Sequence, residues 1–193
     1  MNNQSGNYKK YNNKNPLMGM VVSRFLNQVK QLADSINVSK ILDVGCGEGF
    51  VTNVLNKKVV AGLDISRGAL IIAKEENPKC SFFGGSVNDL PFNNDSFDLV
   101  VATEVLEHLK DPKKAILEIR RTSKRYCIFS VPNEPYFKFM NLLRGKNIIR
   151  LGNDIEHIQN WSSGNFVALL KDYFEIIEIR KPFPWTVVLC EKK

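Results

Sequence analysis

An apolar run that ends in three closely spaced glycines limits the folds open to this chain more sharply than any other feature of its sequence. The run spans 40–44 (KILDV), and Gly45, Gly47 and Gly49 follow it before a helical pattern begins at Phe50. Glycine lets a backbone turn sharply and lets a ligand approach the main chain closely. The segment therefore predicts a strand, a ligand-binding turn and a helix, in that order.

The rest of the chain repeats this alternation of strand and helix. Strands are expected at 40–44, 59–63, 80–83, 97–102, 126–131, 174–180 and 186–190, and helices at 17–36, 50–56, 67–76, 112–122, 135–145 and 164–172. Strands that alternate with helices form a mostly parallel sheet with helices on both faces. The predicted class is thus a doubly wound α/β fold, whose ligands bind beyond the carboxyl ends of the strands.

The length of 193 residues predicts a single domain over 16–193. Residues 1–15 hold six asparagines and three lysines and are expected to form a flexible polar tail that lacks the apolar core of a secretory signal. No stretch approaches the 18 apolar residues of a membrane-spanning helix. The four cysteines form no CxxC pair, which favours reduced thiols and a cytoplasmic location.

Two acidic residues indicate which ligand the glycine turn holds. Asp64 ends the second strand, 19 residues after Gly45, where a carboxylate can accept both hydroxyls of a ribose. The glycine spacing is G-x-G-x-G rather than the G-x-G-x-x-G of dinucleotide sites, and Asp43 precedes it. A carboxylate at that strand end would repel a pyrophosphate but attract an ammonium group. The charge therefore favours S-adenosylmethionine (S-adenosyl-L-methionine), which carries an amino group and a sulfonium and no phosphate.

Several segments together resemble the class I S-adenosylmethionine-dependent methyltransferases, in particular the small-molecule, type 11-like branch. The similar segments are LDVGCGEG (42–49), LPF with FDLVV (90–101) and EVLEHLKDP (104–112). The resemblance implies a Rossmann-like sheet of seven strands whose last strand is antiparallel. It also implies a set of cofactor-binding residues, namely Asp43, Gly45, Cys46 and Gly47 at the methionyl part, Asp64 at the ribose, Ile65, Ser86 and Val87 at the adenine and Thr103 near the methionine end.

One position departs from the family pattern. Ser86 stands where the family usually has an aspartate that accepts the adenine amino group. A neutral hydrogen bond contributes about 0.5–1.5 kcal/mol, against about 1.5–3 kcal/mol for a bond to a charged group. We therefore expect weaker cofactor binding, or assistance from Asn88, rather than loss of binding.

The two histidines, His108 and His157, are the candidate catalytic bases, because histidine titrates near neutral pH. His108 closes the cluster Glu104, Glu107, His108, and ubiquinone-biosynthesis O-methyltransferases carry a similar segment for which metal dependence is discussed. Three such ligands could hold a divalent ion, but we favour a structural role for the cluster and predict no metal. His157 lies in a stretch (154–162) that resembles the segment before the sixth strand of many small-molecule methyltransferases, where it would act as a base or position the substrate.

Basic charge gathers in one part of the sequence. The chain carries a formal net charge of +7, and 110–150 alone holds eleven lysines and arginines against three acidic residues. Within it, 135–150 interleaves aromatic and aliphatic residues with cations, so we expect 135–161 to form an insert that covers an apolar acceptor. The same residues could lie on an anionic membrane surface. Solvated helix faces would explain the charge equally well.

These observations predict a methyltransferase that acts on a small, largely apolar acceptor, most readily at oxygen. The alternatives are methylation of RNA or protein and a non-catalytic S-adenosylmethionine-binding partner subunit. Nucleic acid is disfavoured because 103–106 (TEVL) replaces the D/N/S-P-P-aromatic motif that amine-methylating enzymes of this fold carry after the fourth strand. The sequence leaves the acceptor and the oligomeric state open.

Overall fold

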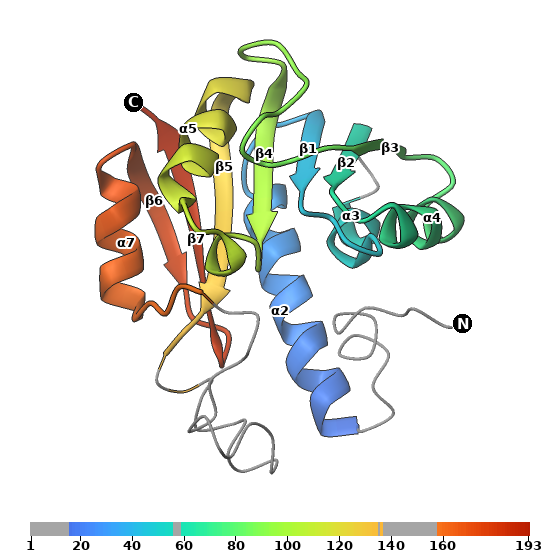
Figure 1. Cartoon of the computed structure of the whole chain (residues 1–193). Helices are drawn as coiled ribbons and strands as arrows, with labels where there is room; N and C mark the ends of the chain where they lie inside the picture. Colours follow the sequence, from blue (N-terminus) through green and yellow to red (C-terminus); the bar gives the residue numbers. More distant parts are fainter. Residues whose placement is uncertain (1–15, 56–58, 135, 137–157) are drawn as a thin grey trace.

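The computed structural model describes residues 16–55, 59–134, 136 and 158–193. These residues form a central sheet with helices on both of its faces (Figure 1). The strands are β1 (Lys40–Val44), β2 (Val59–Asp64), β3 (Ser81–Gly84), β4 (Phe97–Thr103), β5 (Ser123–Pro132), β6 (Phe174–Arg180) and β7 (Trp185–Lys192). The helices are α2 (Pro16–Asp34), α3 (Phe50–Leu55), α4 (Arg67–Glu76), the 3₁₀ turn η1 (Leu106–His108), α5 (Pro112–Thr122) and α7 (Ser163–Lys171).

The sheet has seven strands in the order β3-β2-β1-β4-β5-β7-β6. The first five are parallel to their neighbours, and β7 lies antiparallel between β5 and β6. This confirms the predicted mostly parallel, doubly wound sheet with an antiparallel last strand. The strand order reverses between β1 and β4, and at such a switch point the carboxyl ends of neighbouring strands leave a crevice open to a ligand.

Each strand of the centre contributes to two cores, because successive side chains point to opposite faces. Leu42 of β1 and Val100 of β4 face one core, which α5 and α7 cover. Ile41 and Leu99, one residue earlier in each strand, face the other core, which α2 and α3 cover. The near-continuous apolar strands in the sequence therefore reflect burial on both sides.

The described helices begin within one residue of the predicted starts, and the caps of three of them explain why. Ser66, Asp111 and Ser162 each accept a hydrogen bond from the backbone N–H three residues later, which satisfies an otherwise unpaired donor of the first turn. Pro112 stands at the first position of α5, where its missing N–H costs nothing.

The largest difference from the predicted bounds is the start of β5, whereas the ends of the other described elements shift by at most two residues. β5 begins at Ser123, three residues before the predicted start, and its second and third residues, Lys124 and Arg125, are exposed. Because these two residues are charged, the hydrophobic pattern of the sequence does not mark them as part of the strand. The expected tail at 1–15 and the expected insert apart from Tyr136 and 158–161 lie outside the described residues. The division into domains stays a prediction. Among the described helices, none is long and apolar enough to cross a bilayer.

Candidate functional site

The turn after β1 has a backbone that requires glycine. Gly45, Gly47 and Gly49 have φ angles of 67°, 51° and 82°, in the left-handed region that side chains disfavour. A Cβ atom on Gly45 would lie 2.4 Å from a methyl group of Val105. The amides of Gly45 and Cys46 donate to the carbonyl of Leu63 at 2.7 and 3.1 Å, so the turn is fastened to the neighbouring strand β2.

Asp64, at the end of β2, holds the same turn through its side chain. Its two carboxylate oxygens accept hydrogen bonds from the backbone N–H groups of Gly47 and Ser66, both at 2.8 Å. Each oxygen keeps a further lone pair, because a carboxylate oxygen can accept two bonds. A ligand with two neighbouring hydroxyl groups could therefore still be bound by Asp64.

A cavity of about 230 Å³ opens beside Asp64 at the carboxyl ends of β1, β2 and β4. Its lining brings together six of the predicted cofactor residues, namely Gly45, Gly47, Asp64, Ile65, Ser86 and Val87. His108, a candidate base, lines it too. The side chain of Ile65 is 80% exposed, which places a bare apolar surface at the mouth of the cavity. Among the described residues, Asn88 is not part of this lining; its backbone N–H donates to the Ser86 hydroxyl at 3.2 Å.

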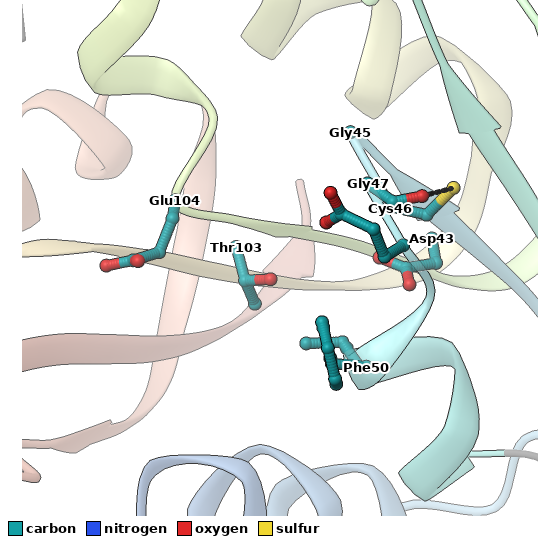
Figure 2. Close-up of a pocket in the computed structure, with 9 residues that line it drawn as sticks. Asp43, Gly45, Cys46, Gly47, Phe50, Thr103 and Glu104 are labelled. Carbon is teal, nitrogen blue, oxygen red and sulfur yellow. Dashed lines mark hydrogen bonds between the residues drawn. The ribbon is translucent and has the colours of Figure 1, made fainter. Parts of the chain in front are cut away.

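A second, smaller cavity of about 30 Å³ adjoins the first and shares Gly45, Gly47 and Glu104 with it. Its lining contains the remaining predicted residues, Asp43, Cys46 and Thr103 (Figure 2). In this view Thr103 lies between Asp43 and Glu104. The structure thus places all nine predicted cofactor residues around two adjoining cavities.

Asp43 is the most unusual charged group of the smaller cavity. Its side chain is fully buried, and Thr52 donates its hydroxyl proton to Oδ2 at 2.6 Å. Among the residues that the structure describes, the other oxygen, Oδ1, has no hydrogen-bond partner. Burial raises the pKa of this carboxyl to about 7, with the nearby Asp64 adding to the effect. A buried carboxylate oxygen that lacks a donor, beside a cavity, is suited to accept one from a cationic ligand.

Cys46 does not have the properties of a nucleophile. Its side chain is buried, and burial raises the pKa of the thiol far above the ordinary value. The other three cysteines are also free and buried. Within the glycine turn, Cys46 therefore contributes its backbone and its volume.

Glu104 is a site residue that the sequence analysis considered only as a metal ligand. It follows β4 directly, lines both cavities and has a φ of 57°. A residue other than glycine in this region costs of order 1–3 kcal/mol, and such positions cluster at functional sites. The indole Nε1–H of Trp185 donates to its carboxylate. Sequence could indicate its place after a strand end but not its backbone conformation.

The cluster Glu104, Glu107 and His108 does not form a ligand set in the structure. Over the described residues, no three histidine, cysteine or acidic side chains are placed to hold a metal ion. The backbone carbonyl of Glu107 instead accepts bonds from the N–H groups of Ile158 and Gln159, at 2.8 and 2.9 Å. The chain therefore returns to η1 at 158–159. Whether the protein uses a metal stays a prediction.

The other candidate base and most of the expected insert cannot be placed. His157 and 137–157 lie outside the described residues. Trp161, which follows them, is partly buried and packs on Phe166 of α7, with ring centres 5.6 Å apart. Its carbonyl accepts the N–H of Glu134 at 3.0 Å. This end of the expected insert is thus packed against the core that α5 and α7 cover.

Comparison with known proteins identifies a domain and a fold. Residues 42–130 match the model of a family described as methyltransferase domain. An uncharacterized methyltransferase of Schizosaccharomyces pombe is 39% identical over 100 residues, which cover 44% of this chain and 36% of that protein. The ubiquinone biosynthesis O-methyltransferase of Vibrio campbellii is 33% identical over 118 residues, which cover 58% of this chain and 47% of that protein. This chain therefore spans less than half the length of either relative.

Solved structures share the fold over nearly the whole chain. The crystal structure of magnesium protoporphyrin IX methyltransferase from Synechocystis, with bound SAH (S-adenosylhomocysteine), superposes with a TM-score of 0.72 at 16% identity. The superposition covers 96% of this chain and 92% of that one. At this identity the likeness concerns the fold alone.

Proposed function

We propose that this chain, which carries a class I methyltransferase domain, transfers the methyl group of S-adenosylmethionine to a small, largely apolar acceptor, at an oxygen atom. The observation that carries the proposal is the buried Asp43 oxygen without a donor, beside a glycine turn that Asp64 holds. The cofactor supplies a methyl group that is already activated by its bond to a sulfonium.

The residues present fit this cofactor. An ammonium group can donate to Oδ1 of Asp43, whereas the pyrophosphate of a dinucleotide would be repelled by this carboxylate. The free lone pairs of Asp64 suit the ribose hydroxyls. Ile65 and Val87 offer apolar surface to the adenine, and the Ser86 hydroxyl can exchange a hydrogen bond with its edge. Ser86 is uncharged, so we infer weaker adenine recognition than an aspartate would give.

The protein's own contribution to the transfer is mainly position. Holding two reactants in the geometry of an in-line displacement can contribute roughly 7–11 kcal/mol to catalysis. A base is needed only when the acceptor must lose a proton. His108, which lines the larger cavity, and His157 are the proposed bases.

Relatives named for quinone biosynthesis support an apolar acceptor, since such a ring is largely apolar and carries a hydroxyl. The aromatic and basic residues of 135–161 are proposed to cover that acceptor and to make contact with an anionic membrane surface. A cytoplasmic location is part of the same proposal. RNA, protein and a non-catalytic role remain the alternatives that an acceptor screen with labelled cofactor would separate.

The first prediction concerns cofactor binding. Calorimetry is expected to show that S-adenosylmethionine and S-adenosylhomocysteine bind and that NAD does not. Asp64→Asn should weaken binding by about 1.5–3 kcal/mol, the contribution of hydrogen bonds to a charged group. Asp172→Ala, which removes an exposed carboxylate at the end of α7, serves as the control and should bind like the wild type. Tight binding of NAD, or a failure of both S-adenosyl ligands to bind, would show that the proposal is wrong.

A further inference from the structure

The segment between β3 and β4 forms one wall of the larger cavity, yet it has few backbone partners of its own. Gly85, Ser86 and Val87 line the cavity, and the chain then runs to β4 without pairing with a strand of the sheet. An isolated bridge joins Ser86 to Asp89 within the segment. The amide of Gly85 donates to the carbonyl of Asp64 at 3.0 Å, which fixes the start of the segment. What fixes its middle lies in another element.

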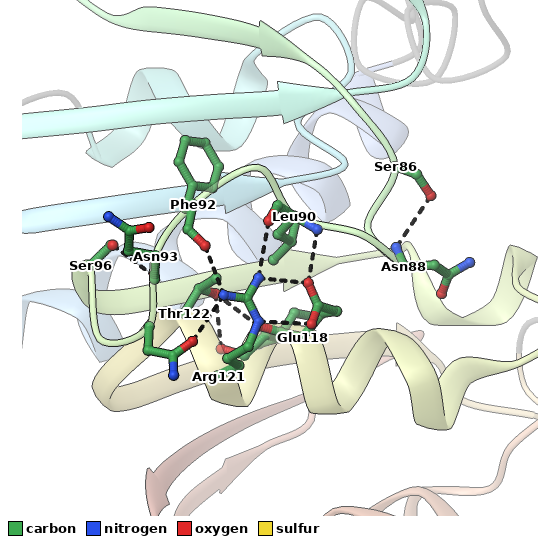
Figure 3. A network of polar contacts seen from close by, with 11 residues as sticks. Ser86, Asn88, Leu90, Phe92, Asn93, Ser96, Glu118, Arg121 and Thr122 are labelled. Carbon is green, nitrogen blue, oxygen red and sulfur yellow. Dashed lines mark hydrogen bonds and ion pairs between the residues drawn. The ribbon is translucent and has the colours of Figure 1, made fainter.

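Two side chains of α5, Glu118 and Arg121, hold the middle of this segment (Figure 3). The N–H of Leu90 donates to Glu118 at 2.9 Å, and the carbonyl of Leu90 accepts from Arg121 at 3.0 Å. The same guanidinium donates to the carbonyl of Phe92 at 2.7 Å and to the side-chain oxygen of Asn94 at 3.1 Å. One arginine thus contacts three acceptors of the segment.

The pair is itself fixed in a two-bond geometry. Arg121 donates to both oxygens of Glu118, at 2.8 and 2.7 Å. A planar guanidinium can make these bonds and still direct its other N–H groups at backbone carbonyls, which a lysine ammonium cannot do. The hydrogen bond from Arg121 holds the pKa of Glu118 below its ordinary value. The two residues therefore form one charged, rigid support.

Leu90, the residue that this pair holds, lies close in sequence to the cavity wall at Ser86 and Val87. Leu90 is buried in the same core as Val87, three residues earlier. The carbonyls of Arg121 and Thr122 accept the amides of Asp95 and Ser96, both at 2.9 Å, so the last turn of α5 also holds the end of the segment. Without the two side chains, the N–H of Leu90 would lose its partner, and the carbonyl of Leu90 would keep only the N–H of Phe92, at 2.8 Å.

We propose that Glu118 and Arg121 are positioning residues for the nucleoside half of the cofactor site. They hold the wall at Ser86 and Val87 in its binding conformation before the ligand arrives. Ligand binding therefore loses no free energy to ordering this wall. The inference rests on the proposed function. It is specific to one half of the site, because Gly85, Ser86 and Val87 of this segment line the larger cavity, whereas no residue of 84–96 lines the smaller one beside Asp43.

The test measures two ligands by calorimetry, S-adenosylhomocysteine and 5′-methylthioadenosine, which has the nucleoside and sulfur but lacks the amino-acid end. Arg121→Ala should weaken both ligands by the same factor, about tenfold or more, which is the scale of one lost charge-assisted bond. Arg121→Lys should recover part of the loss. Asp43→Asn should weaken S-adenosylhomocysteine alone. Arg125→Lys, in an ion pair with Glu191 on β7, is the matched control and should change neither affinity.

Hydrogen exchange without ligand supplies the second readout. Arg121→Ala should speed exchange of the Leu90 amide and its neighbours while the amides of β4 stay protected. If Arg121→Ala does not fold, Glu118→Gln takes its place. This variant should weaken both ligands by the same factor, and that factor should be smaller than the one expected for Arg121→Ala. Unchanged affinity for 5′-methylthioadenosine in a folded variant would overturn the inference. Failure of the wild type to bind either ligand would overturn the proposed function instead.

Discussion

At the scale of single residues, Asp43 combines the features that identify this site. A carboxyl that is fully buried is costly to ionise, and burial accordingly raises its pKa to about 7. The sequence motif around Asp43 predicted that Asp43, the glycines of the turn and Asp64 belong to one ligand site. The unpaired Oδ1 atom could not be predicted, because it depends on how Thr52 of α3 packs against β1.

The raised pKa of Asp43 predicts how the stability of the ligand-free protein depends on pH. The folded-state pKa lies above the unfolded value of 3.8, so the folded state binds the extra proton. This stabilisation is complete below pH 4 and is lost as the pH rises through 7. Relative to Asp43→Asn, the free energy of unfolding of the wild type should fall by about 1.4 kcal/mol per pH unit over that range.

Urea denaturation of both proteins between pH 4 and 8 measures this difference. Saturating S-adenosylhomocysteine is expected to reverse this difference in stability between the two proteins above pH 7, because the ionised Asp43 then has a cationic partner. Parallel pH profiles for the two proteins would contradict a titrating Asp43.

At the scale of elements, the sequence predicts the strands and helices whose ends carry explicit signals. Glycine, proline and capping side chains set the bounds of β1, α4 and α5 nearly to the residue. The wall of the larger cavity was harder to predict, because Leu90 and Arg121 are 31 residues apart and their contact depends on how α5 packs on the sheet. The local sequence pattern gives no information on contacts between residues that are so far apart in the chain.

Asp98 of β4 provides a second contact of this kind, at the opposite edge of the sheet from the cofactor cavities. Its Oδ2 atom accepts from the N–H and hydroxyl of Ser39 and from the N–H of Lys40, at 2.9–3.1 Å. Its Oδ1 atom accepts from the ammonium of Lys124 at 3.0 Å. The carboxylate thus joins the starts of β1, β4 and β5. The N–H of Lys40 contributes most to holding its pKa below the ordinary range.

Asp98→Asn is therefore expected to lower the free energy of unfolding by about 1.5–3 kcal/mol at pH 7, since the lost bonds are to a charged group. A depressed folded-state pKa stabilises above the unfolded pKa and ceases to do so as the pH falls through the folded value, so the difference should shrink below pH 4. Urea denaturation at pH 7 and pH 3 measures it. Asp34→Asn, which removes an exposed pair with Lys30, is the control and should cost under about 1 kcal/mol.

At the scale of the whole molecule, the site depends on parts of the chain that are distant in sequence. The crevice between β1 and β4 exists because the strand order reverses there. On the other side of β4, Trp185 at the start of β7 donates its indole N–H to Glu104, which lines both cavities. Its ring packs on Phe25 of α2, with ring centres 4.7 Å apart. Helix α2, strand β7 and the candidate cofactor site therefore meet at the buried indole of Trp185.

This arrangement makes Trp185 an internal reporter of cofactor binding. A ligand in the cavities that Glu104 lines changes the electric field and the packing around the indole that is bonded to Glu104. Titration with S-adenosylhomocysteine should therefore change the tryptophan fluorescence of the protein, which has two tryptophans. Trp161→Phe should keep the change, because Trp161 packs on α7 and lines neither cavity. Trp185→Phe should abolish it while binding remains measurable by calorimetry. A signal that instead disappears with Trp161 would place the ligand on the side of the sheet that α7 covers.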